Sequence, residues 1–427
     1  MSFEFFAPCP RGLEAALAAE LAEIAQRHLP PGALQAGADV PGGVHFSGNW
    51  AGGMAANLHS RIASRVLLKI AQRPYRGEQD IYALAREQRW EQWFSPNETL
   101  RIDITAIKSP LRSLEFATLR VKDAICDRMR DKAGSRPSID TAYPDVRVFA
   151  FLTATDCTLY LDTSGEPLFK RGWRLDKGAA PLRENLAAGI LRLTGWTPGT
   201  PLYDPMCGSG TFLAEAAQVA LGIAPGLSRS FGFERLKQSD TAAWRHLKSE
   251  ANTARNTAQS RAGELHIYGS DISDVMLEKA RANFARAGLG NVPLKQLDAR
   301  NMTPPEDGAG ILVANPPYGE RIEVRGRNAR GEARPTARDR DDGEERFHRA
   351  ESDAPDAEFF QALGDALKQR FTGWRAFVLT SDRKLPGQLR LRESAKTPLF
   401  NGALECRLFR FDLIAGSVRQ RPAQSNG

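Results

Sequence analysis

From residue 186 onward, short apolar runs alternate with amphipathic helical patterns, and no other feature of the chain constrains its fold as much. This alternation is typical of a parallel sheet that is covered by helices on both faces. We therefore predict an α/β fold with a Rossmann-like, doubly wound sheet. The predicted strands, in chain order, are 201–204, 266–271, 292–297, 311–315 and 376–380.

The end of the chain has a different pattern. Residues 396–400 and 403–411 are both strand-like, and they flank the dipeptide Asn401-Gly402. This dipeptide suits the two positive φ angles of a type I′ turn. We therefore expect an antiparallel hairpin at one edge of the parallel sheet.

The first 165 residues mix helical and strand patterns without regular alternation. Helical spacing of apolar residues predicts helices at 12–27, 57–70 and 116–130. Strands are predicted at 3–7, 43–47 and 99–107, and a hairpin at 146–154 and 157–161. We therefore expect an α+β region with antiparallel pairing in front of the α/β domain.

The net charge of +7 is unevenly distributed. Residues 51–174 carry 20 Lys and Arg against 15 Asp and Glu, whereas residues 1–50 carry two against five. The second segment is therefore the better candidate for contacting the phosphates of a nucleic acid. Candidate contacts are Arg11, Lys170, Arg171 and Arg174, and each is equally well explained as an exposed surface charge.

Several classes of protein are disfavoured by what the sequence lacks. The five cysteines are scattered and the six histidines lack ligand spacing, so we expect neither a disulfide framework nor a metal. The chain has no run of about twenty apolar residues and no secretory pattern after Met1, so we expect a cytoplasmic protein without membrane contact. Residues 325–355 and 417–427 are polar and predict a mobile loop and a frayed tail. The loop could alternatively fold against RNA.

The strongest motif runs from Asp204 to Thr211, with the sequence DPMCGSGT, between a predicted strand and a predicted helix. Small residues at such a turn let the backbone approach a ligand, and the helix that follows presents free N–H groups. Met206, Cys207, Gly208 and Gly210 are therefore candidate ligand contacts. A tight strand-to-helix turn without a ligand would also explain them.

Two acidic residues follow the next predicted strands. Asp271, followed by Ile272, is placed to accept hydrogen bonds from ribose hydroxyls, and Asp298, followed by Ala299, from an adenine amine. The spacing between Asp204 and Asp271 exceeds the roughly twenty residues of the dinucleotide fingerprint, so a helical insertion must lie between them, at 222–261. Asp298 alone would also suit an ordinary helix cap.

The last motif, Asn315-Pro316-Pro317-Tyr318, ends the fourth predicted strand. The prolines stiffen the loop and remove two backbone donors, which leaves carbonyl oxygens and the Asn315 side-chain oxygen as acceptors. Such a site suits a substrate NH₂ group, and Tyr318 could stack on an extruded base. The competing interpretation is a rigid proline turn with a core tyrosine.

These four motifs, in this order, resemble those of class I amino-methyltransferases. The segments DPMCGSGTFLAEAA, FKRGWR, APLRENLAAGIL, GSDIS, NPPYGERI and NGALECRLFRF resemble the THUMP-containing N2-guanine methyltransferases of 23S ribosomal RNA. The resemblance implies a ferredoxin-like element at 1–50, a THUMP RNA-binding domain at 51–165, a linker at 166–185 and a methyltransferase domain at 186–416. We expect no second methyltransferase domain of the kind that is fused in some relatives.

The resemblance also implies a cofactor, a partner and site residues. The cofactor would be S-adenosylmethionine, and the partner 23S ribosomal RNA or a ribosome assembly intermediate, bound by a monomer. Its catalytic residues would be Asn315, Pro316 and Tyr318. Its cofactor-binding residues would be Asp204, Met206, Cys207, Gly208, Gly210, Thr211, Asp271, Ile272, Asp298, Ala299 and Asn315.

Other functions remain open at this stage. Transfer RNA is an alternative substrate, as are adenine N6 and a protein glutamine amide, because enzymes acting on these amines use similar loops. A noncatalytic RNA-binding or assembly factor is a further alternative, which the intact motifs at 204–211 and 315–318 disfavour. We also expect a protein that begins near Gly178 to fold alone and bind the cofactor.

Overall fold

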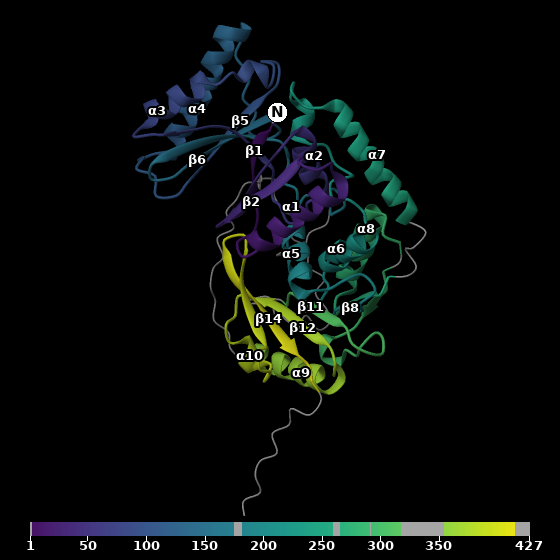
Figure 1. Ribbon diagram of the computed structural model, residues 1–427. Helices are drawn as coiled ribbons and strands as arrows, with labels where there is room; N and C mark the ends of the chain where they lie inside the picture. The colour runs from purple at the N-terminus through teal and green to yellow at the C-terminus, as the bar shows by residue number, and fades with distance from the viewer. Residues whose placement is uncertain (1, 175–181, 259–264, 291, 317–353, 415–427) are drawn as a thin grey trace, which may run out of the picture.

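The computed structural model describes residues 2–174, 182–258, 265–290, 292–316 and 354–414. Figure 1 shows two halves, each built around a seven-stranded sheet, with α3 and α4 remote from α9. Strands β1 to β7 form the first sheet and β8 to β14 the second. Within the described ranges, every helix is too short or too polar to span a bilayer.

The first half is the α+β region that the sequence predicts. Its strands follow the order β2-β3-β1-β4-β7-β6-β5, and all neighbours are antiparallel except β5 and β6. The predicted hairpin is confirmed as β6 and β7. The strands are β1 Phe3–Pro8, β2 Leu34–Val40, β3 Gly43–Gly48, β4 Leu67–Pro74, β5 Leu100–Ala106, β6 Val146–Leu152 and β7 Asp156–Asp162. The helices are α1 Glu14–His28, α2 Trp50–His59, α3 Glu78–Glu87, η1 Trp90–Gln92 and α4 Leu114–Ala133.

This sheet contains both of the regions that the sequence assigns to a ferredoxin-like element and a THUMP domain. Strand β4 pairs with β1 on one side and with β7 on the other, so hydrogen bonding is continuous across the expected border at residues 50 and 51. The position of that border therefore stays a prediction.

The helix predicted at 57–70 is wrong. Helix α2 begins earlier, where the Asn49 side chain accepts a hydrogen bond from the Gly52 N–H at 3.0 Å, and it ends at His59. A Cβ atom at Gly52 would lie 2.1 Å from the Ala33 carbonyl oxygen, so glycine lets the helix start directly against β2. Ile62 is buried, but it lies in an irregular segment before β4, so its helical spacing was misleading.

The second half has the predicted doubly wound sheet, in the order β10-β9-β8-β11-β12-β14-β13. Strands β8 to β12 are parallel to one another, and β14 is antiparallel to both β12 and β13. All five predicted parallel strands are confirmed. The strands are β8 Leu202–Asp204, β9 Ile267–Asp271, β10 Leu294–Gln296, β11 Ile311–Ala314, β12 Arg375–Thr380, β13 Ala395–Asn401 and β14 Leu404–Asp412.

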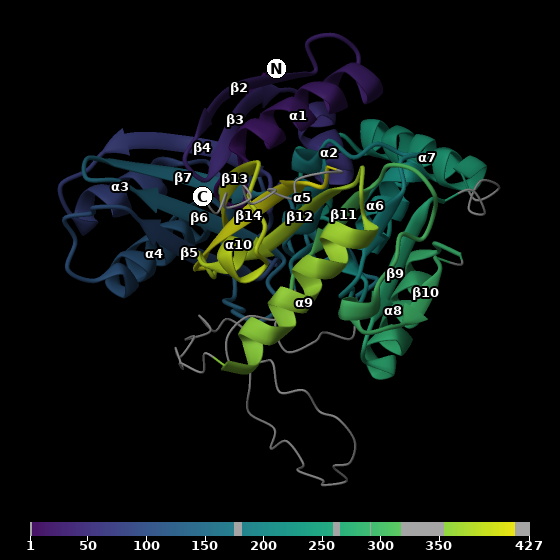
Figure 2. The same ribbon diagram turned by 90° about the horizontal axis from the view of Figure 1, so that it is seen from below.

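Helices cover both faces of this sheet. The face that carries Leu312 and Val378 packs against α9, and the face that carries Val313 and Leu379 packs against the core shared with α5 and α6 (Figure 2). The predicted insertion contains α7. The helices are α5 Glu184–Thr194, α6 Thr211–Ala220, η2 Gly232–Arg235, α7 Thr241–Ala258, α8 Asp274–Ala287, η4 Ala299–Asn301, α9 Ala354–Arg370 and α10 Leu385–Gln388.

The edge hairpin of β13 and β14 is confirmed, but its predicted turn is wrong. Asn401 pairs with Leu404, so the two turn residues are Gly402 and Ala403. Gly402 has a φ of +65°, whereas neither Asn401 nor Ala403 has a positive φ. Glycine therefore stands first in the turn, as in type II′, because the strand includes Asn401.

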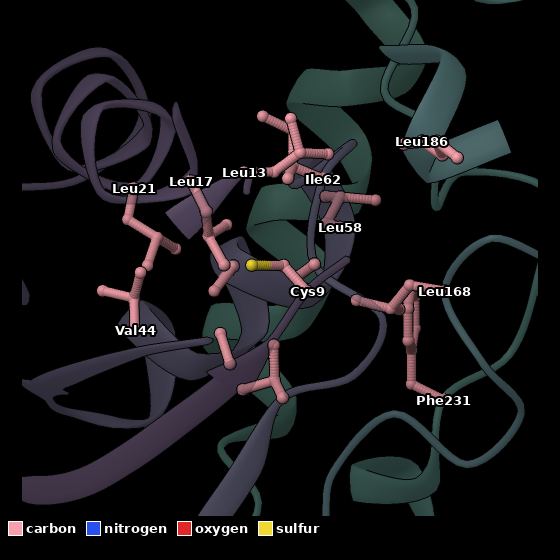
Figure 3. Packing of buried hydrophobic residues seen from close by; sticks show 14 of the residues in the cluster. Cys9, Leu13, Leu17, Leu21, Val44, Leu58, Ile62, Leu168, Leu186 and Phe231 are labelled. Carbon is pink, nitrogen blue, oxygen red and sulfur yellow. The ribbon is translucent and has the colours of Figure 1, made fainter. Parts of the chain in front are cut away.

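The two halves share one hydrophobic core. Figure 3 shows Leu17, Val44 and Ile62 of the first half in the same cluster as Leu186 and Phe231 of the second. At Gly189 of α5, a Cβ atom would lie 2.3 Å from Leu13 Cδ1. The helices α1 and α5 can therefore pack closely only because this position lacks a side chain.

A buried cluster of charges also joins the halves. Glu215 of α6 is fully buried, and its carboxylate oxygens lie 3.1 Å from Arg61 Nη1 and 3.1 Å from Arg171 Nε. Arg171 also donates to the carbonyl oxygens of Leu168 at 2.7 Å and Arg61 at 2.6 Å. Burial lowers the pKa of Arg61, and the Glu215 carboxylate opposes that shift.

This geometry argues against two expectations from the sequence, namely that Arg171 and Arg174 contact RNA and that a protein beginning near Gly178 folds alone. Arg171 is buried, and Arg174 donates to Leu182 O at 2.7 Å and pairs with Glu184, so neither side chain is available to RNA. Arg11 and Lys170 do lie at the surface. A protein that begins near Gly178 would lose Arg61 and Arg171, the two partners of Glu215, and would expose part of the core that both halves share, so the structure argues against independent folding.

We predict that Glu215→Gln lowers the free energy of unfolding by about 3–5 kcal/mol, because it leaves two buried guanidinium groups without their counter-ion. Chemical denaturation followed by circular dichroism measures this. Glu278→Gln is the matched control, since Glu278 is exposed on α8. Equal denaturation midpoints for the two variants would show that the buried cluster does not hold the halves together.

Candidate active site

The candidate site lies at the carboxyl edge of the second sheet. Strand β8 lies between β9 and β11, and the chain crosses from one side of β8 to the other between them. In open α/β sheets, ligands bind outside the carboxyl ends of the strands at such a switch point. Asp204, Asp271, Asp298 and Asn315 end or directly follow β8, β9, β10 and β11. The structure thus brings all four sequence motifs to one edge.

The glycine-rich turn after β8 is held by backbone hydrogen bonds. Cys207 N–H donates to Ser270 O at 2.9 Å, and Gly210 N–H donates to Cys207 O at 2.8 Å. Gly208 and Gly210 have φ angles of +53° and +81°, which few other residues adopt. A Cβ atom at Gly210 would lie 2.6 Å from the Phe284 ring, so this glycine also lets α8 approach the turn.

Two predicted contacts of this turn have buried side chains. Asp204 Oδ1 accepts a hydrogen bond from Met206 N–H at 3.1 Å, and burial raises the pKa of Asp204 well above its usual range. Burial likewise raises the pKa of the Cys207 thiol. Thr211 is buried at the start of α6, whereas Met206 and Gly208 are partly exposed. These last two residues are the part of the turn that a ligand can reach.

Asp271 connects the turn to β9. Its Oδ2 accepts from Gly208 N–H at 2.8 Å, and its Oδ1 accepts from Ser273 N–H at 2.9 Å. Each carboxylate oxygen has a further lone pair, so both can accept another hydrogen bond. Asp271 can therefore shape the turn and bind hydroxyl groups at the same time.

Exposed apolar side chains stand beside this carboxylate. Ile272 is 60% exposed, and Val275 in the first turn of α8 is 61% exposed. An exposed large apolar side chain suggests a contact surface for a flat or apolar ligand group. Sequence reasoning found Ile272 but missed Val275, because an apolar residue in an amphipathic helix is indistinguishable from a core residue before burial is known.

Asp298 has a local partner. Its side chain caps η4 by accepting from Arg300 N–H at 2.9 Å, and its Oδ2 lies 2.6 Å from Arg300 Nη2. The Arg300 guanidinium holds the pKa of Asp298 below its usual value. The capping role that the sequence also allowed is therefore observed. Ala299, which follows, is buried.

Asn315 carries the most informative atom of the site. Its side-chain Oδ1 is buried, and no residue in the described ranges donates a hydrogen bond to it, although buried oxygens in proteins are nearly always paired. Pro316 beside it is buried. Pro317 and Tyr318 lie outside the described residues. Asn315 thus presents an acceptor without a donor at the end of β11.

No metal site accompanies these groups in the described ranges, where no three His, Cys, Asp or Glu side chains are grouped to hold an ion. The five cysteines are free and buried. Within the described ranges, the groups that the site offers are backbone groups, three carboxylates and one amide.

Comparison with known families identifies the parts of the chain. Residues 171–330 match a family described as RMKL-like, methyltransferase domain. Residues 75–162 match the THUMP domain, and residues 4–67 match the RlmL ferredoxin-like domain. A protein of Synechocystis named "Putative RNA methyltransferase" is 36% identical over 96% of this chain and 96% of its own length.

The chain belongs to the THUMP-containing, RMKL-like methyltransferase family. Ribosomal RNA large subunit methyltransferase K/L of Aeromonas hydrophila is 37% identical over 97% of this chain. The match covers 55% of that relative, so this chain spans about half the length of such relatives.

Solved structures agree with the family assignment. SMU.472, determined in complex with SAH, superposes with a TM-score of 0.78 at 27% identity and covers 96% of this chain and 98% of its own. A Listeria monocytogenes protein named a "predicted N6-adenine-specific DNA methylase" has the same TM-score at 28% identity, covering 96% of both chains. TrmN from Thermus thermophilus, at 18% identity and a TM-score of 0.63, shares the fold. The methyltransferase fold and its two accompanying domains are thereby confirmed.

We predict that Gly210→Ala destabilises this protein more than Gly195→Ala does. Both glycines have positive φ, which costs an alanine about 1–2 kcal/mol, but a Cβ atom meets nothing within 4 Å at Gly195. At Gly210 the contact with Phe284 adds about 1–3 kcal/mol of overpacking. Thermal unfolding of the two variants measures the difference, and equal losses would contradict the close approach of α8.

Proposed function

We propose that this chain is an S-adenosylmethionine-dependent RNA methyltransferase that methylates the N2 amine of a guanine in 23S ribosomal RNA. Membership of the RMKL-like family supports methyl transfer, and the THUMP domain supports an RNA substrate. The large-subunit ribosomal RNA methyltransferases K/L among the relatives support 23S RNA. We further propose that the protein acts in the cytoplasm as a monomer, on 23S RNA or an assembly intermediate.

The cofactor proposal rests on the edge formed by β8, β9 and β10. The related SMU.472 was determined with SAH, which is the product that S-adenosylmethionine leaves after methyl transfer. Here, Gly208 and Gly210 would let the backbone approach the amino-acid part, and Asp271 would accept from the ribose hydroxyls. Ile272 and Val275 offer apolar contact to the adenine, and Asp298 an acceptor for its amine. Bound there, the cofactor supplies an electrophilic methyl group.

Asp204, Cys207 and Thr211 contribute differently in this proposal. Because their side chains are buried, they would hold the turn rather than contact the cofactor directly. Met206 is partly exposed and can contact the ligand through its backbone and side chain. Ala299, buried after Asp298, would support the adenine end of the site.

The observation that carries the proposed chemistry is the unpaired Oδ1 of Asn315. An exocyclic guanine amine is a poor nucleophile because its lone pair is delocalised into the ring. Asn315 Oδ1 and the Pro316 carbonyl would accept its two N–H groups and favour the pyramidal nitrogen. These acceptors also stabilise the positive charge that develops on nitrogen, so the proton can leave afterward to water without a tuned general base.

Tyr318 completes the proposed substrate site. An aromatic ring next to the two acceptors could stack on the extruded guanine and hold it in place. This role rests on the sequence motif and the family resemblance, since Tyr318 is outside the described residues.

The RNA-binding surface is proposed to lie in the first half. Helix α4 exposes Phe116 by 51% and Leu119 by 49%, and Tyr143 is 88% exposed. Aromatic side chains of this kind can stack on unpaired bases, and the exposed Arg112 and the half-buried Arg120 lie near these α4 residues in sequence. Sequence reasoning used the basic excess of this region but did not find its exposed apolar residues.

Other amine substrates are the rivals to this proposal, namely a guanine of transfer RNA, adenine N6 and a protein glutamine amide. Mass-spectrometric mapping of modified nucleosides in 23S ribosomal and transfer RNA, with and without the gene, separates them. Loss of one N2-methylguanine from 23S RNA is expected. An unchanged 23S pattern together with a lost transfer-RNA modification would replace the proposed substrate.

We predict that Asp271→Ala weakens S-adenosylmethionine binding by about 1–3 kcal/mol, because the ribose hydroxyls lose their acceptor. Isothermal titration calorimetry measures the dissociation constant. Asp274→Ala is the matched control, because Asp274 is an exposed carboxylate three residues later. An Asp271 variant that binds as the control does would remove Asp271 from the cofactor site.

We predict that Asn315→Ala lowers methyl transfer at least a hundredfold while leaving cofactor affinity nearly unchanged. Loss of one preorganised electrostatic partner costs about 3–4 kcal/mol of transition-state stabilisation, which is enough for that factor. Single-turnover transfer from labelled cofactor to ribosomal RNA is the measurement, and cofactor calorimetry is its control. Near-normal transfer by this variant would refute the proposed mechanism for any target base.

A further inference from the structure

A small cavity lies away from the candidate active site, at the other ends of α6 and α8. Its volume is about 100 Å³, and its walls include Ile223 to Pro225, which follow α6, and Arg286 to Gly288 at the end of α8. Both helices begin beside the glycine-rich turn and are 10 and 14 residues long. At 1.5 Å per residue, the cavity is roughly 15–20 Å from that turn.

Three arginines are among the residues that line this cavity, which we name the arginine cavity: Arg171, whose guanidinium group is paired with Glu215, Arg255 and Arg286. The described residues of its wall include no Asp or Glu. Arg171 and Trp173 are buried and belong to its interior, whereas Ser228 and Gly288 are exposed. The arginine cavity therefore combines positive charge with a route from solvent.

Two buried donors in this wall have no acceptor. The indole Nε1–H of Trp173, a residue that is 3% exposed, and the Nε–H of Arg255 each lack a hydrogen-bond partner in the part of the chain that the structure describes. Other tryptophans do find acceptors, as Trp90 does with Ala85 O at 2.6 Å and Trp374 with Gly308 O at 2.8 Å. Buried donors are normally satisfied, so the arginine cavity lacks an acceptor that its walls do not provide.

The walls are fixed in place. Arg171 is held by Glu215 and by two carbonyl oxygens. Its positive charge lies close to the cavity, so it can act on a bound ligand without contacting the ligand directly. Arg286 Nε donates to Trp173 O at 2.9 Å, which ties α8 to the segment that carries the unpaired indole. A ligand would thus meet a preformed site and lose little entropy in ordering it.

We propose that the arginine cavity binds a phosphate group. A phosphate has several acceptor oxygens and a negative charge, and guanidinium and indole N–H groups are donors that suit it. The group could be a phosphodiester of the RNA backbone or a free phosphate. The competing occupant is water alone, which could also accept from both donors.

The test uses the full chain and inorganic phosphate, titrated by calorimetry at constant ionic strength. Arg255→Gln removes one donor and one charge and is expected to weaken phosphate binding at least tenfold. Arg245→Gln is the matched control, since Arg245 is exposed on the same helix and outside the cavity wall, and it should bind as the unaltered protein does. Trp173→Phe should also weaken binding while retaining the charge.

Competition with a single-stranded oligoribonucleotide distinguishes the two sources of phosphate. If the RNA backbone occupies the arginine cavity, inorganic phosphate competes with RNA, and Arg255→Gln reduces the salt dependence of RNA binding by about one ion. If the site takes free phosphate, RNA affinity is the same in both arginine variants. The proposal is overturned if the unaltered protein binds no phosphate, or if Arg255→Gln and Arg245→Gln bind it equally.

Discussion

The buried carboxylate of Glu215 is the contact on which the arrangement of the two halves depends. It lies on α6, the helix that starts at the glycine-rich turn, and it is held by Arg61 from the first half and Arg171 from the linker. Removing such a carboxylate from water is unfavourable unless its partners are fixed. The helix that presents the candidate cofactor site is therefore held against the half that contains the THUMP domain.

A second carboxylate fixes one of those partners. Glu20 of α1 accepts hydrogen bonds from Ser60 Oγ at 2.6 Å and from the backbone N–H groups of Arg61 at 3.0 Å and Ile62 at 3.2 Å. The segment after α2 therefore has a defined conformation, from which Arg61 reaches Glu215 and Ile223 O. The position of the active-site helix thus depends on a residue near the start of the chain, which explains why we do not expect the second half to fold alone.

The strands of the second half could be predicted because their sequence patterns are local. The errors in the first half arose where burial depends on residues far away in the sequence. Strands β8, β11 and β12 are short apolar runs that are buried on both faces, so the centre of the parallel sheet could be identified from sequence. The false helix at 57–70 arose because Ile62 is buried in the core that both halves share, and helical spacing cannot report which element buries a residue. Likewise, Arg171 appeared to be a surface cation because its partner Glu215 is 44 residues away.

In the candidate site, too, the sequence predicted what depends on local pattern and missed which contacts the individual side chains make. The order of the motifs predicted that Asp204, Asp271, Asp298 and Asn315 would meet at one edge, since parallel strands end together. The sequence could not predict that Asp271 accepts a hydrogen bond from Gly208 N–H or that Asp298 is paired with Arg300. Nor could it predict that Asn315 Oδ1 has no hydrogen-bond donor among the described residues. This difference separates their roles. Asp271 and Asp298 already have ground-state donors, whereas none of the described residues donates to the Asn315 oxygen. A bound amine could therefore be its first donor, and the strength of this acceptor can increase most as the amine becomes positively charged.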